Sequence, residues 1–272
     1  MATPIGNLGD ISSRALDSLA RADAIAAEDT RVTARLLEHH RLRGRLIAVH
    51  EHNERQVADR IIRELALGKN IALVTDAGTP GISDPGALVV ARARAAGFKV
   101  VPIPGPNAAV TALSAAGLPD GPFLFFGFLP ARPAARRKAL AQLRETPYTL
   151  VFYEAPHRIV ECVEDISAVL GADRTLVLAR ELTKMFEEIH RCRSSDAAGW
   201  LSENPDRQRG EFVLIVEGAP ARKASDDWEA VLSGLLAEMP LARAVKLACK
   251  LTGAKKNTVY ARALSLAGKA RN

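Results

Sequence analysis

Short apolar runs alternate with segments of helical periodicity along the first two thirds of the chain. The apolar runs are bounded by turn residues, which is typical of buried strands. They lie at 46–50, 70–75, 99–103, 123–128, 149–153, 175–179 and 212–216. Strands that alternate with helices form an α/β fold with a largely parallel sheet. We therefore predict a mostly parallel first sheet, followed by a mixed sheet where the strands lie closer together.

Three helices between these strands are predicted from their end signals. The first begins with Asp10 as N-cap, and its apolar stripe consists of Ile11, Ala15, Leu19 and Ala22. The second begins at Asp84-Pro85, a capping acid before a proline, and ends at Gly97. The third spans about 107–117.

Chain-breaking residues and a change of periodicity predict three domains. Glycine and proline concentrate at 117–122 (GLPDGP), which places a boundary there. The predicted domains are an N-terminal α/β domain (1–118), a second α/β domain (119–220) and a basic helical extension (221–272). In the extension, apolar residues recur at helical spacing on both sides of a glycine, which resembles a helix-turn-helix. These residues are Leu241, Val245, Ala248 and Thr252 before Gly253, and Val259, Ala263 and Leu266 after it.

Composition excludes several classes of protein. The 272 residues are 48% hydrophobic and 25% charged, as in ordinary globular domains. No apolar run approaches the roughly 18 residues of a membrane helix, and we expect no targeting segment. The three cysteines are far apart and odd in number, which favours a reducing, cytoplasmic location over a disulfide framework.

The positive charge is concentrated in two stretches. The net charge is +6, yet residues 241–272 hold eight Lys and Arg and no acid, and 131–144 hold five, again with no acid. Such clusters are typical of polyanion binding, although cations also keep exposed helices soluble. We favour nucleic acid as partner. The expected RNA contacts are Arg132, Arg136, Arg137, Lys138, Lys255, Lys256 and Arg262.

Common nucleotide, hydrolase and metal motifs are absent from the sequence. There is no P-loop, no GxGxxG after a strand, no GxSxG and no HExxH. The histidine pairs 39/40 and 50/52 lack the spacing that directs two imidazoles to one metal on a helix. We therefore expect no metal site.

Four loops rich in glycine and proline each follow or open a strand-like segment. They are 2–10 (ATPIGNLGD), 75–86 (TDAGTPGISDPG), 102–108 (PIPGPNA) and 153–158 (YEAPHR). In open parallel sheets, ligands bind beyond the carboxyl ends of the strands. Glycine allows close approach of the backbone, so the four loops together predict a cleft for a small molecule, although tight connections alone also use these residues.

These loops also carry a resemblance to a known family. Seven segments occur in the family's order: TPIGNLGDI, AAEDTR, TDAGTPGISDPG, PGPNA, YEAPHR, ARELTKMFEE and RGEFVLIVEG. The chain resembles the ribosomal small-subunit RNA 2′-O-methyltransferase I family, within the tetrapyrrole methylase (class III S-adenosylmethionine) superfamily. The match is dense over residues 2–219 and looser through KKNTVYARAL at 255–264.

The resemblance implies a fold, a donor, an acceptor and a partner. It implies two α/β domains with S-adenosylmethionine in the cleft between them, and a homodimer. The implied reaction is transfer of a methyl group to the ribose 2′-hydroxyl of a cytidine in the decoding centre of 16S rRNA, in the small ribosomal subunit. The implied donor contacts are Pro4, Ile5, Gly6, Asp84, Gly86, Gly105, Asn107, Ala108, Tyr153 and Glu154, with Leu182, Gly210 and Glu211 facing the same cleft.

Two of these positions carry specific expectations. A side chain at Gly105 is expected to fill the space of the donor. Asp84 has two compatible roles, because an acid before proline is also a helix cap.

The catalytic base is left open by the sequence. The acceptor hydroxyl must lose its proton, so a positioned base is expected. Candidate bases and phosphate contacts lie in two motifs, and spacing does not select among them. They are Glu28, Asp29 and Arg31 in AAEDTR, and Arg180, Glu181, Lys184 and Glu187 in ARELTKMFE.

Two rival functions and one structural misfit accompany this interpretation. The rivals are a tetrapyrrole C-methylase on the same fold, and a non-catalytic RNA-binding assembly factor. The misfit is that only Met1 and Ala2 precede the TPIGN loop, where the family pattern has an apolar strand. We therefore expect either a native start further upstream or an unusually unstable chain.

Overall fold

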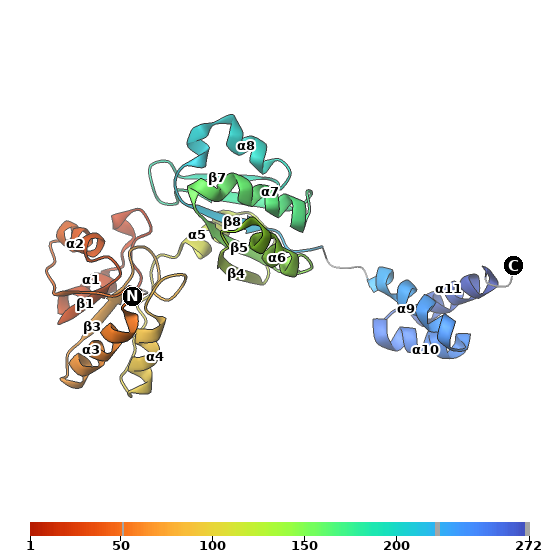
Figure 1. Cartoon of the computed structure of the whole chain (residues 1–272), viewed down its shortest axis with the longest axis horizontal. Coiled ribbons are helices and arrows are strands. Elements are labelled where there is room, and N and C mark those ends of the chain that lie inside the picture. The colour runs from red at the N-terminus through yellow and green to blue at the C-terminus, as the bar shows by residue number, and fades with distance from the viewer. Residues whose placement is uncertain (51, 221–223, 270–272) are drawn as a thin grey trace. The chain divides into compact units, whose positions relative to one another are not determined.

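The computed structural model describes residues 1–50, 52–220 and 224–269, and divides into two compact units (Figure 1). The first unit, Met1–Ala219, contains both sheets, so the predicted division after residue 118 falls inside it. The second unit is Pro220–Asn272. Within the described residues, no helix is long and apolar enough to cross a membrane.

The first sheet is parallel and has three strands in the order β2-β1-β3. They are β1 (Ala24–Ala27), β2 (Leu46–Ala48) and β3 (Ile71–Val74). Alternate side chains of β1 enter two different cores. Ile25 and Ala27 pack with α1 and α2, whereas Ala26 packs with α3 and α4. Helices on both faces therefore bury the central strand completely, as expected for a parallel α/β sheet.

The first sheet is accompanied by helices, most of which are preceded by a capping side chain or a glycine. They are α1 (Ser13–Arg21), α2 (Thr30–His39), α3 (Glu54–Ala66), α4 (Ala87–Ala95) and α5 (Ala108–Ala115), with a short 3-10 turn, η1, at Leu8–Asp10. Asn107 caps α5 as predicted, because its side chain accepts a hydrogen bond from Val110 N. Two other predicted starts are wrong. Ser12, not Asp10, caps α1, and Gly86, not Asp84, precedes α4.

The apolar run at 99–103 forms no strand, so that prediction is wrong. Residues at the start of the chain reach both this run and β3. Ala2 N donates to the Ile103 carbonyl at 3.2 Å, and the Met1 amine donates to the Leu73 carbonyl at 2.8 Å. A strand needs a ladder of bonds to its neighbour, and one such bond does not make a ladder.

The second sheet is mixed and has five strands in the order β4-β5-β8-β6-β7. β4 and β5 are parallel, and the other pairs are antiparallel. The strands are β4 (Phe123–Phe128), β5 (Thr149–Glu154), β6 (Thr175–Arg180), β7 (Glu188–Arg193) and β8 (Phe212–Val216). The predicted α/β class with a parallel first and mixed second sheet is confirmed.

Helices cover the second sheet on both faces. The larger core lies under α6 (Pro133–Leu143), α7 (Ile159–Leu170) and α8 (Ala197–Glu203). Short 3-10 turns precede α7 (η2, Pro156–Arg158) and follow α8 (η3, Pro205–Gln208). On the other face, α5 packs its alanines on Val151, Val177 and Ile215. Ile5 from the first loop packs in the same cluster, so this core contains residues that come before the first sheet as well as residues of the second sheet.

The second unit consists of helices around its own small core. They are α9 (Ala224–Glu238), α10 (Leu241–Thr252) and α11 (Lys256–Lys269). Gly253 ends α10 in a left-handed conformation (φ 70°), as a glycine at this position permits. Val245, Ala248, Val259 and Ala263 are buried there, which confirms the predicted helix–turn–helix pattern. Residues 221–223 of the predicted extension, and Arg271 among its cations, lie outside the described part.

Candidate functional site

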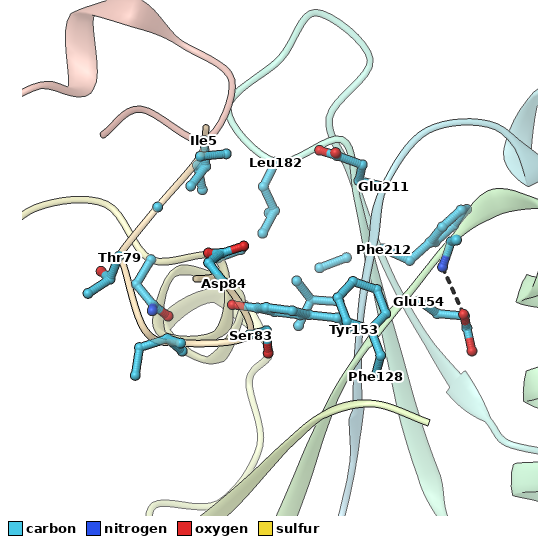
Figure 2. Close-up of a pocket in the computed structure, with 18 residues that line it drawn as sticks. Ile5, Thr79, Ser83, Asp84, Phe128, Tyr153, Glu154, Leu182, Glu211 and Phe212 are labelled. Carbon is cyan, nitrogen blue, oxygen red and sulfur yellow. Dashed lines mark hydrogen bonds between the residues drawn. The ribbon is translucent and has the colours of Figure 1, made fainter. Parts of the chain in front are cut away.

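A cavity of about 250 Å³ lies where the loops after the strands of the first unit meet (Figure 2). One wall comes from Ile5 and the 75–86 loop, which contributes Thr79, Ser83 and Asp84. The opposite wall comes from the ends of β4, β5, β6 and β8, with Tyr153 extending across the middle of the space in Figure 2. The complete lining is Ile5, Ala77, Gly78, Thr79, Ile82, Ser83, Asp84, Asn107, Ala108, Phe128, Tyr153, Glu154, Ala155, Ala179, Leu182, Glu211, Phe212 and Val213.

The charge of this lining has one sign. The carboxyl groups that face it belong to Asp84 and Glu211, whereas the fully buried Glu154 side chain points away from the cavity (Figure 2), and none of the described lining residues is Lys, Arg or His. A phosphate site needs backbone N–H groups with cations. The cavity instead offers apolar side chains, hydroxyls and carboxylates, a set that suits an uncharged or positively charged small molecule.

Asp84 is free for the cavity because another acid caps the helix that follows it. The Glu54 side chain at the start of α3 accepts hydrogen bonds from Gly86 N at 2.9 Å and Leu88 N at 3.0 Å. These are N–H groups that an N-cap residue would otherwise satisfy. The capping role expected for Asp84 therefore belongs to Glu54, which sequence spacing could not reveal because 32 residues separate Glu54 from Gly86.

Behind this first wall, the carboxyl groups of Glu28 and Asp76 follow the ends of β1 and β3 and act on the cavity residue Asp84. Glu28 accepts hydrogen bonds from the Thr75 hydroxyl and from Asp76 N (3.3 Å), and Asp76 accepts one from Asp29 N at 2.8 Å. Burial, together with the charges of Glu28 and Asp76, raises the pKa of Asp84 to about 6, although a hydrogen bond with Thr75 opposes this. Burial and Glu28 also raise the pKa of Asp76. Asp84 can therefore accept a proton near neutral pH.

The opposite wall is aromatic at its centre. The Tyr153 hydroxyl accepts a hydrogen bond from Ala109 N at 3.2 Å, at the start of α5. Its ring contacts Phe125 and Phe128 edge-on, with ring centres 4.9 Å and 5.6 Å apart. Burial raises the pKa of this hydroxyl, and the charge of Asp84 adds to the effect. Tyr153 thus stays neutral and holds one side of the cavity in place.

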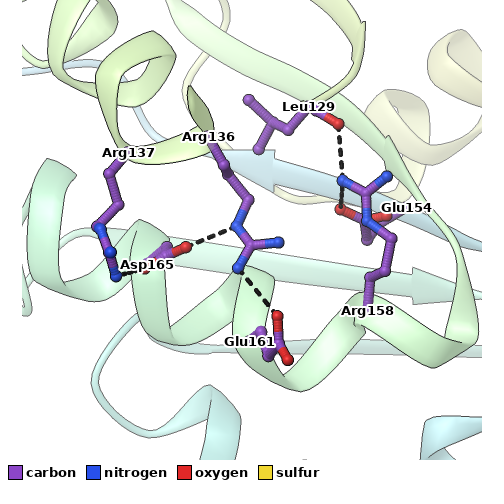
Figure 3. Close-up of polar contacts among 7 residues, drawn as sticks. All are labelled: Leu129, Arg136, Arg137, Glu154, Arg158, Glu161 and Asp165. Carbon is purple, nitrogen blue, oxygen red and sulfur yellow. Dashed lines mark hydrogen bonds and ion pairs between the residues drawn. The ribbon is translucent and has the colours of Figure 1, made fainter. Parts of the chain in front are cut away.

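Glu154 is a buried carboxylate whose charge is balanced from behind the cavity (Figure 3). Its side chain is 0% exposed, and its partner Arg158 donates to it at 3.2 Å and to the Leu129 carbonyl at 2.7 Å. Glu154 also accepts a bond from Ala155 N at 2.9 Å. Arg158 therefore ties the end of β5 to the residue that follows β4.

The loop at 181–187, between β6 and β7, forms the remaining rim. Lys184 pairs with Glu181 and with Glu211, both at 2.8 Å. Burial raises the pKa of Glu181, but its bonds from Lys184 and from Glu211 N outweigh this and lower the pKa below its usual value. Among the predicted catalytic candidates, Glu181 and Lys184 are thus engaged with each other.

The candidates in the AAEDTR motif are Glu28, Asp29 and Arg31, and two of these three also pair with each other. Arg31 donates to Asp29 at 2.5 Å, and this bond lowers the pKa of Asp29 to about 2. Asp29 also caps α2. Glu28 lies next to the cavity residue Asp84 without lining the cavity itself. Glu28 thus acts on a cavity residue, whereas Asp29 and Arg31 form an ion pair with each other and do not line the cavity.

Eight of the residues implied as donor contacts line the cavity. They are Ile5, Asp84, Asn107, Ala108, Tyr153, Glu154, Leu182 and Glu211. The others, Pro4, Gly6, Gly86, Gly105 and Gly210, do not line it. Gly6 is required by a close approach, because a Cβ there would lie 2.5 Å from Lys184 Cγ. A Cβ on Gly105 would meet the Cβ of Ala2 at 3.0 Å, so the expectation that a side chain there fills the cavity is corrected.

Several lining residues were not singled out from the sequence. The sequence predicts that the 75–86 loop, which contains Thr79 and Ser83, borders the cleft. It assigns Phe128 and Phe212 only to strands. The signal for Phe128 was available, since it ends a strand that is parallel to its neighbour.

The cations expected to bind RNA fall into two groups. Arg136 is 1% exposed and forms ion pairs with Asp165 (2.6 Å) and Glu161 (3.3 Å) on α7, as Figure 3 shows. Its assignment to RNA is therefore wrong. Arg137 pairs with Asp165 at 3.3 Å but remains half exposed, and Arg132 and Lys138 are exposed.

In the second unit, Lys255 and Lys256 are exposed at the start of α11. Arg262 forms an ion pair with Glu229 of α9 at 3.0 Å, while remaining nearly half exposed. Two lysines at the turn therefore keep the surface position that the sequence predicted. In the described residues, no group of three or more His, Cys, Asp or Glu is arranged to hold a metal ion.

Comparison with known proteins finds a matching family model for each unit. Residues 2–198 match the family Tetrapyrrole (Corrin/Porphyrin) Methylases, and residues 222–267 match the RsmI C-terminal HTH domain. The chain is 51% identical to Ribosomal RNA small subunit methyltransferase I of Escherichia coli O157:H7, over 98% of this chain and 94% of that protein. It is 50% identical to the protein of the same name from Pseudomonas aeruginosa, over 99% and 97%.

Solved structures share the fold at low sequence identity. The cobalt precorrin-4 methyltransferase CbiF matches with a TM-score of 0.60 at 15% identity, over 80% of this chain and 92% of that one. The uroporphyrin-III-C-methyltransferase from Thermus thermophilus matches with a TM-score of 0.56 at 21% identity, over 79% and 91%. With half of its residues shared with the ribosomal RNA proteins over nearly their full length, the chain belongs to the ribosomal RNA small subunit methyltransferase I family, within the tetrapyrrole (corrin/porphyrin) methylases.

Proposed function

We propose that this protein transfers a methyl group from S-adenosylmethionine to the ribose 2′-hydroxyl of a cytidine in the decoding centre of 16S rRNA. The observation that supports the donor is the cavity itself, which the carboxyl groups of Asp84 and Glu211 face (Figure 2) and whose described lining residues include no Lys, Arg or His. S-adenosylmethionine supplies a methyl group on a positively charged sulfonium. Carboxylates around such a group lower its energy, whereas a cationic lining would repel it.

Asp84 is the residue that we assign as general base. As the ribose oxygen bonds to the methyl carbon and the methyl–sulfur bond breaks, the hydroxyl proton passes to the Asp84 carboxylate. A base is most effective when its pKa lies near the working pH, and the pKa of Asp84 is about 6. The remaining contribution is orientation of the two reactants by the loops at 75–86 and 181–187.

The other carboxylates of the lining are less suited to accept this proton. Glu154 is buried and paired with Arg158, and Glu211 is paired with Lys184. Each is therefore engaged by a cation, unlike Asp84, and the Glu154 side chain points away from the cavity (Figure 2). Tyr153 and Leu182 supply the apolar body of the site.

The RNA partner is supported by the second unit. Its residues match a domain described as a helix-turn-helix, and Lys255 and Lys256 are exposed at the turn between α10 and α11. A tetrapyrrole substrate is small and has little use for such a unit. The tetrapyrrole enzymes named above share only 15% and 21% of their residues with this chain, against about half for the ribosomal RNA proteins. We further propose that the protein acts as a homodimer in the cytoplasm, where its three free cysteines stay reduced.

The test is transfer of labelled methyl groups to small ribosomal subunits that lack the modification, followed by mapping of the modified ribose. We expect label on one cytidine 2′-oxygen. Transfer to a base, or to tetrapyrrole precursors in place of subunits, contradicts the proposal. Donor binding measured by calorimetry separates both enzymes from a non-catalytic assembly factor, which would bind subunits without binding S-adenosylmethionine.

A second experiment tests whether the second unit binds RNA. Lys255→Ala combined with Lys256→Ala should weaken subunit binding and flatten its dependence on salt. Each lost phosphate contact should reduce the slope of log affinity against log salt by about 0.7–0.9. Donor affinity should not change, because both lysines belong to a different unit from the cavity.

A further inference from the structure

Two large apolar side chains are exposed at the tip of the loop at 181–187. Met185 is 90% exposed and Phe186 is 66% exposed. Single exposed apolar residues are common on protein surfaces, so exposure alone assigns no role. These two are adjacent in sequence, however, and lie on a loop that borders the cavity.

The backbone of this loop is held firmly. Thr183 N donates to the Glu187 carboxylate at 2.5 Å, and Lys184 N donates to the Glu181 carbonyl at 3.0 Å. Glu181 and Thr183 both have left-handed backbone conformations, with φ of 51° and 65°. Such conformations persist only where surrounding contacts enforce them, and they cluster at ligand sites. Met185 and Phe186 are therefore presented on a preorganised loop, so little entropy is lost when something binds them.

The loop is joined to both walls of the cavity. Leu182 lines the cavity, and the Thr183 hydroxyl accepts a bond from Asn7 N at 3.1 Å. Lys184 bonds to Glu211, which lines the cavity beside Leu182 in Figure 2. Phe186 follows the lining residue Leu182 by four residues, so the exposed tip belongs to a loop that borders the cavity.

Two acids, Glu187 and Glu188, directly follow this tip, and beyond them the outward-facing charges of β7 are cationic. β7 exposes alternate residues, and its outward side chains after Phe186 are Ile189, Arg191 and Arg193. Arg191 donates to the Gly117 carbonyl at 2.8 Å, and Arg193 lies 3.6 Å from Asp173, with both side chains of that pair largely exposed. An aromatic and a thioether side chain followed by arginines fit a nucleic-acid strand, whose bases stack and whose phosphates are anionic.

We propose that Met185 and Phe186 form a stacking platform for an unpaired base of the RNA substrate, next to the ribose that receives the methyl group. This inference rests on the proposed function, because that function places an RNA ribose at the mouth of the cavity. The nucleotide of an unpaired base can turn its ribose into a cavity more readily than one that is held in a paired and stacked helix. An exposed aromatic ring at the rim replaces the stacking that the base loses.

The test compares variants in binding to unmodified small ribosomal subunits. Phe186→Ala should weaken binding by about 5- to 150-fold, the range that stacking of one base on an aromatic ring provides. Tyr148→Ala removes an aromatic side chain of similar exposure before β5, and serves as the matched control with unchanged binding. Donor affinity and melting temperature should match the parent in both variants, since neither side chain lines the cavity or is buried.

A spectroscopic signature reports stacking directly. Phe186→Trp should bind subunits like the parent, and its added fluorescence should be quenched by a single-stranded oligocytidylate. Tyr148→Trp should show no such quenching. Unchanged subunit binding by Phe186→Ala, or an unquenched Phe186→Trp, overturns the inference. So does a change in sedimentation of Phe186→Ala, which would assign the tip to contact with a second copy of the chain.

Binding is measured without turnover, so the two proposals fail separately. A parent protein that binds subunits but transfers no methyl group contradicts the proposed function, while the binding ratios still decide the platform. If the parent protein transfers methyl groups and Phe186→Ala binds subunits as well as the parent does, only the stacking platform is contradicted. A parent protein that binds no subunits contradicts both.

Discussion

The two walls of the cavity carry carboxylates in opposite electrostatic settings. At the first wall, the cavity residue Asp84 has Asp76 and Glu28 behind it, and burial and the charge of Glu28 raise the pKa values of both aspartates. On the wall formed by the second sheet, Glu154 and Glu211 are each paired with a cation. The same residue type therefore serves two purposes, and only the environment tells them apart.

The difference shows where a proton can move. Arg158 and Lys184 already engage the carboxylates of Glu154 and Glu211, so these groups are less suited to take a proton from a substrate. A carboxylate that lies among others accepts a proton readily. The four predictions below test this contrast, from the largest expected effect to the smallest.

Asp84→Asn should abolish most activity. Loss of a positioned base lowers the rate by about 10²- to 10⁴-fold, measured as labelled methyl transfer to subunits. Because burial favours the neutral form of Asp84, its ionised form destabilises the fold above a pH of about 6. A neutral amide should therefore leave the melting temperature unchanged or raise it. Asp120→Asn, an exposed control, should keep full activity, and normal activity of Asp84→Asn would refute the assignment of the base.

Arg158→Met should destabilise the first unit by about 3–5 kcal/mol. It leaves Glu154, which is 0% exposed, without its cation, and a buried charge without a partner is costly. Denaturant unfolding measures the loss. Arg209→Met removes one side of an exposed pair with Asp206 and should change stability by less than about 0.5 kcal/mol. Equal effects of the two variants would mean that Glu154 does not depend on Arg158.

Activity should depend on pH with an acid limb near pH 6. The base must be ionised, so the rate rises with pH through the pKa of Asp84, about 6, and levels off above it. Below the limb, each pH unit lowers the rate by up to about tenfold. Glu28→Gln removes a charge that raises this pKa, so the limb should move to lower pH. A limb that stays in place would show that Glu28 does not act on the base.

Lys184→Met should have the smallest effect. Its two ion pairs are partly exposed, and such pairs contribute about 0–1 kcal/mol each. Donor affinity measured by calorimetry should fall by no more than about tenfold. The acid limb of the pH profile should not move, because Lys184 lies on the opposite wall from Asp84. A shifted limb would mean that the two walls titrate together.

Local patterns predicted several elements well. The apolar runs that form β2, β3, β4, β5, β6 and β8 are predicted correctly because each is a short run bounded by turns. Two strands were missed. β1 is composed of AIAA, and alanine has a low strand preference, while β7 is a polar edge strand with alternate residues exposed. In both cases the neighbouring strands, rather than the residues themselves, determine the structure.

Charge along the chain was a weaker guide than position in the fold. Residues 131–144 and 241–272 both hold cations without acids, yet Arg136 in the first stretch is buried against Asp165, 29 residues away. Lys255 and Lys256 in the second stretch remain exposed. A count along the sequence includes only neighbours in the chain, whereas an ion pair depends on neighbours in space.

The sequence by itself determined the α/β class, the helical final unit, the family and the loops that border the cavity. These follow from periodicity, turn residues and motifs, all of which are local properties of the chain. Only the tertiary structure decided which carboxyl group can take a proton. Glu54 caps α4 from a distant helix and leaves Asp84 to the cavity, while Arg158 and Lys184 hold the carboxylates opposite. Burial and distance set the pKa of each group, and both exist only once the chain has folded.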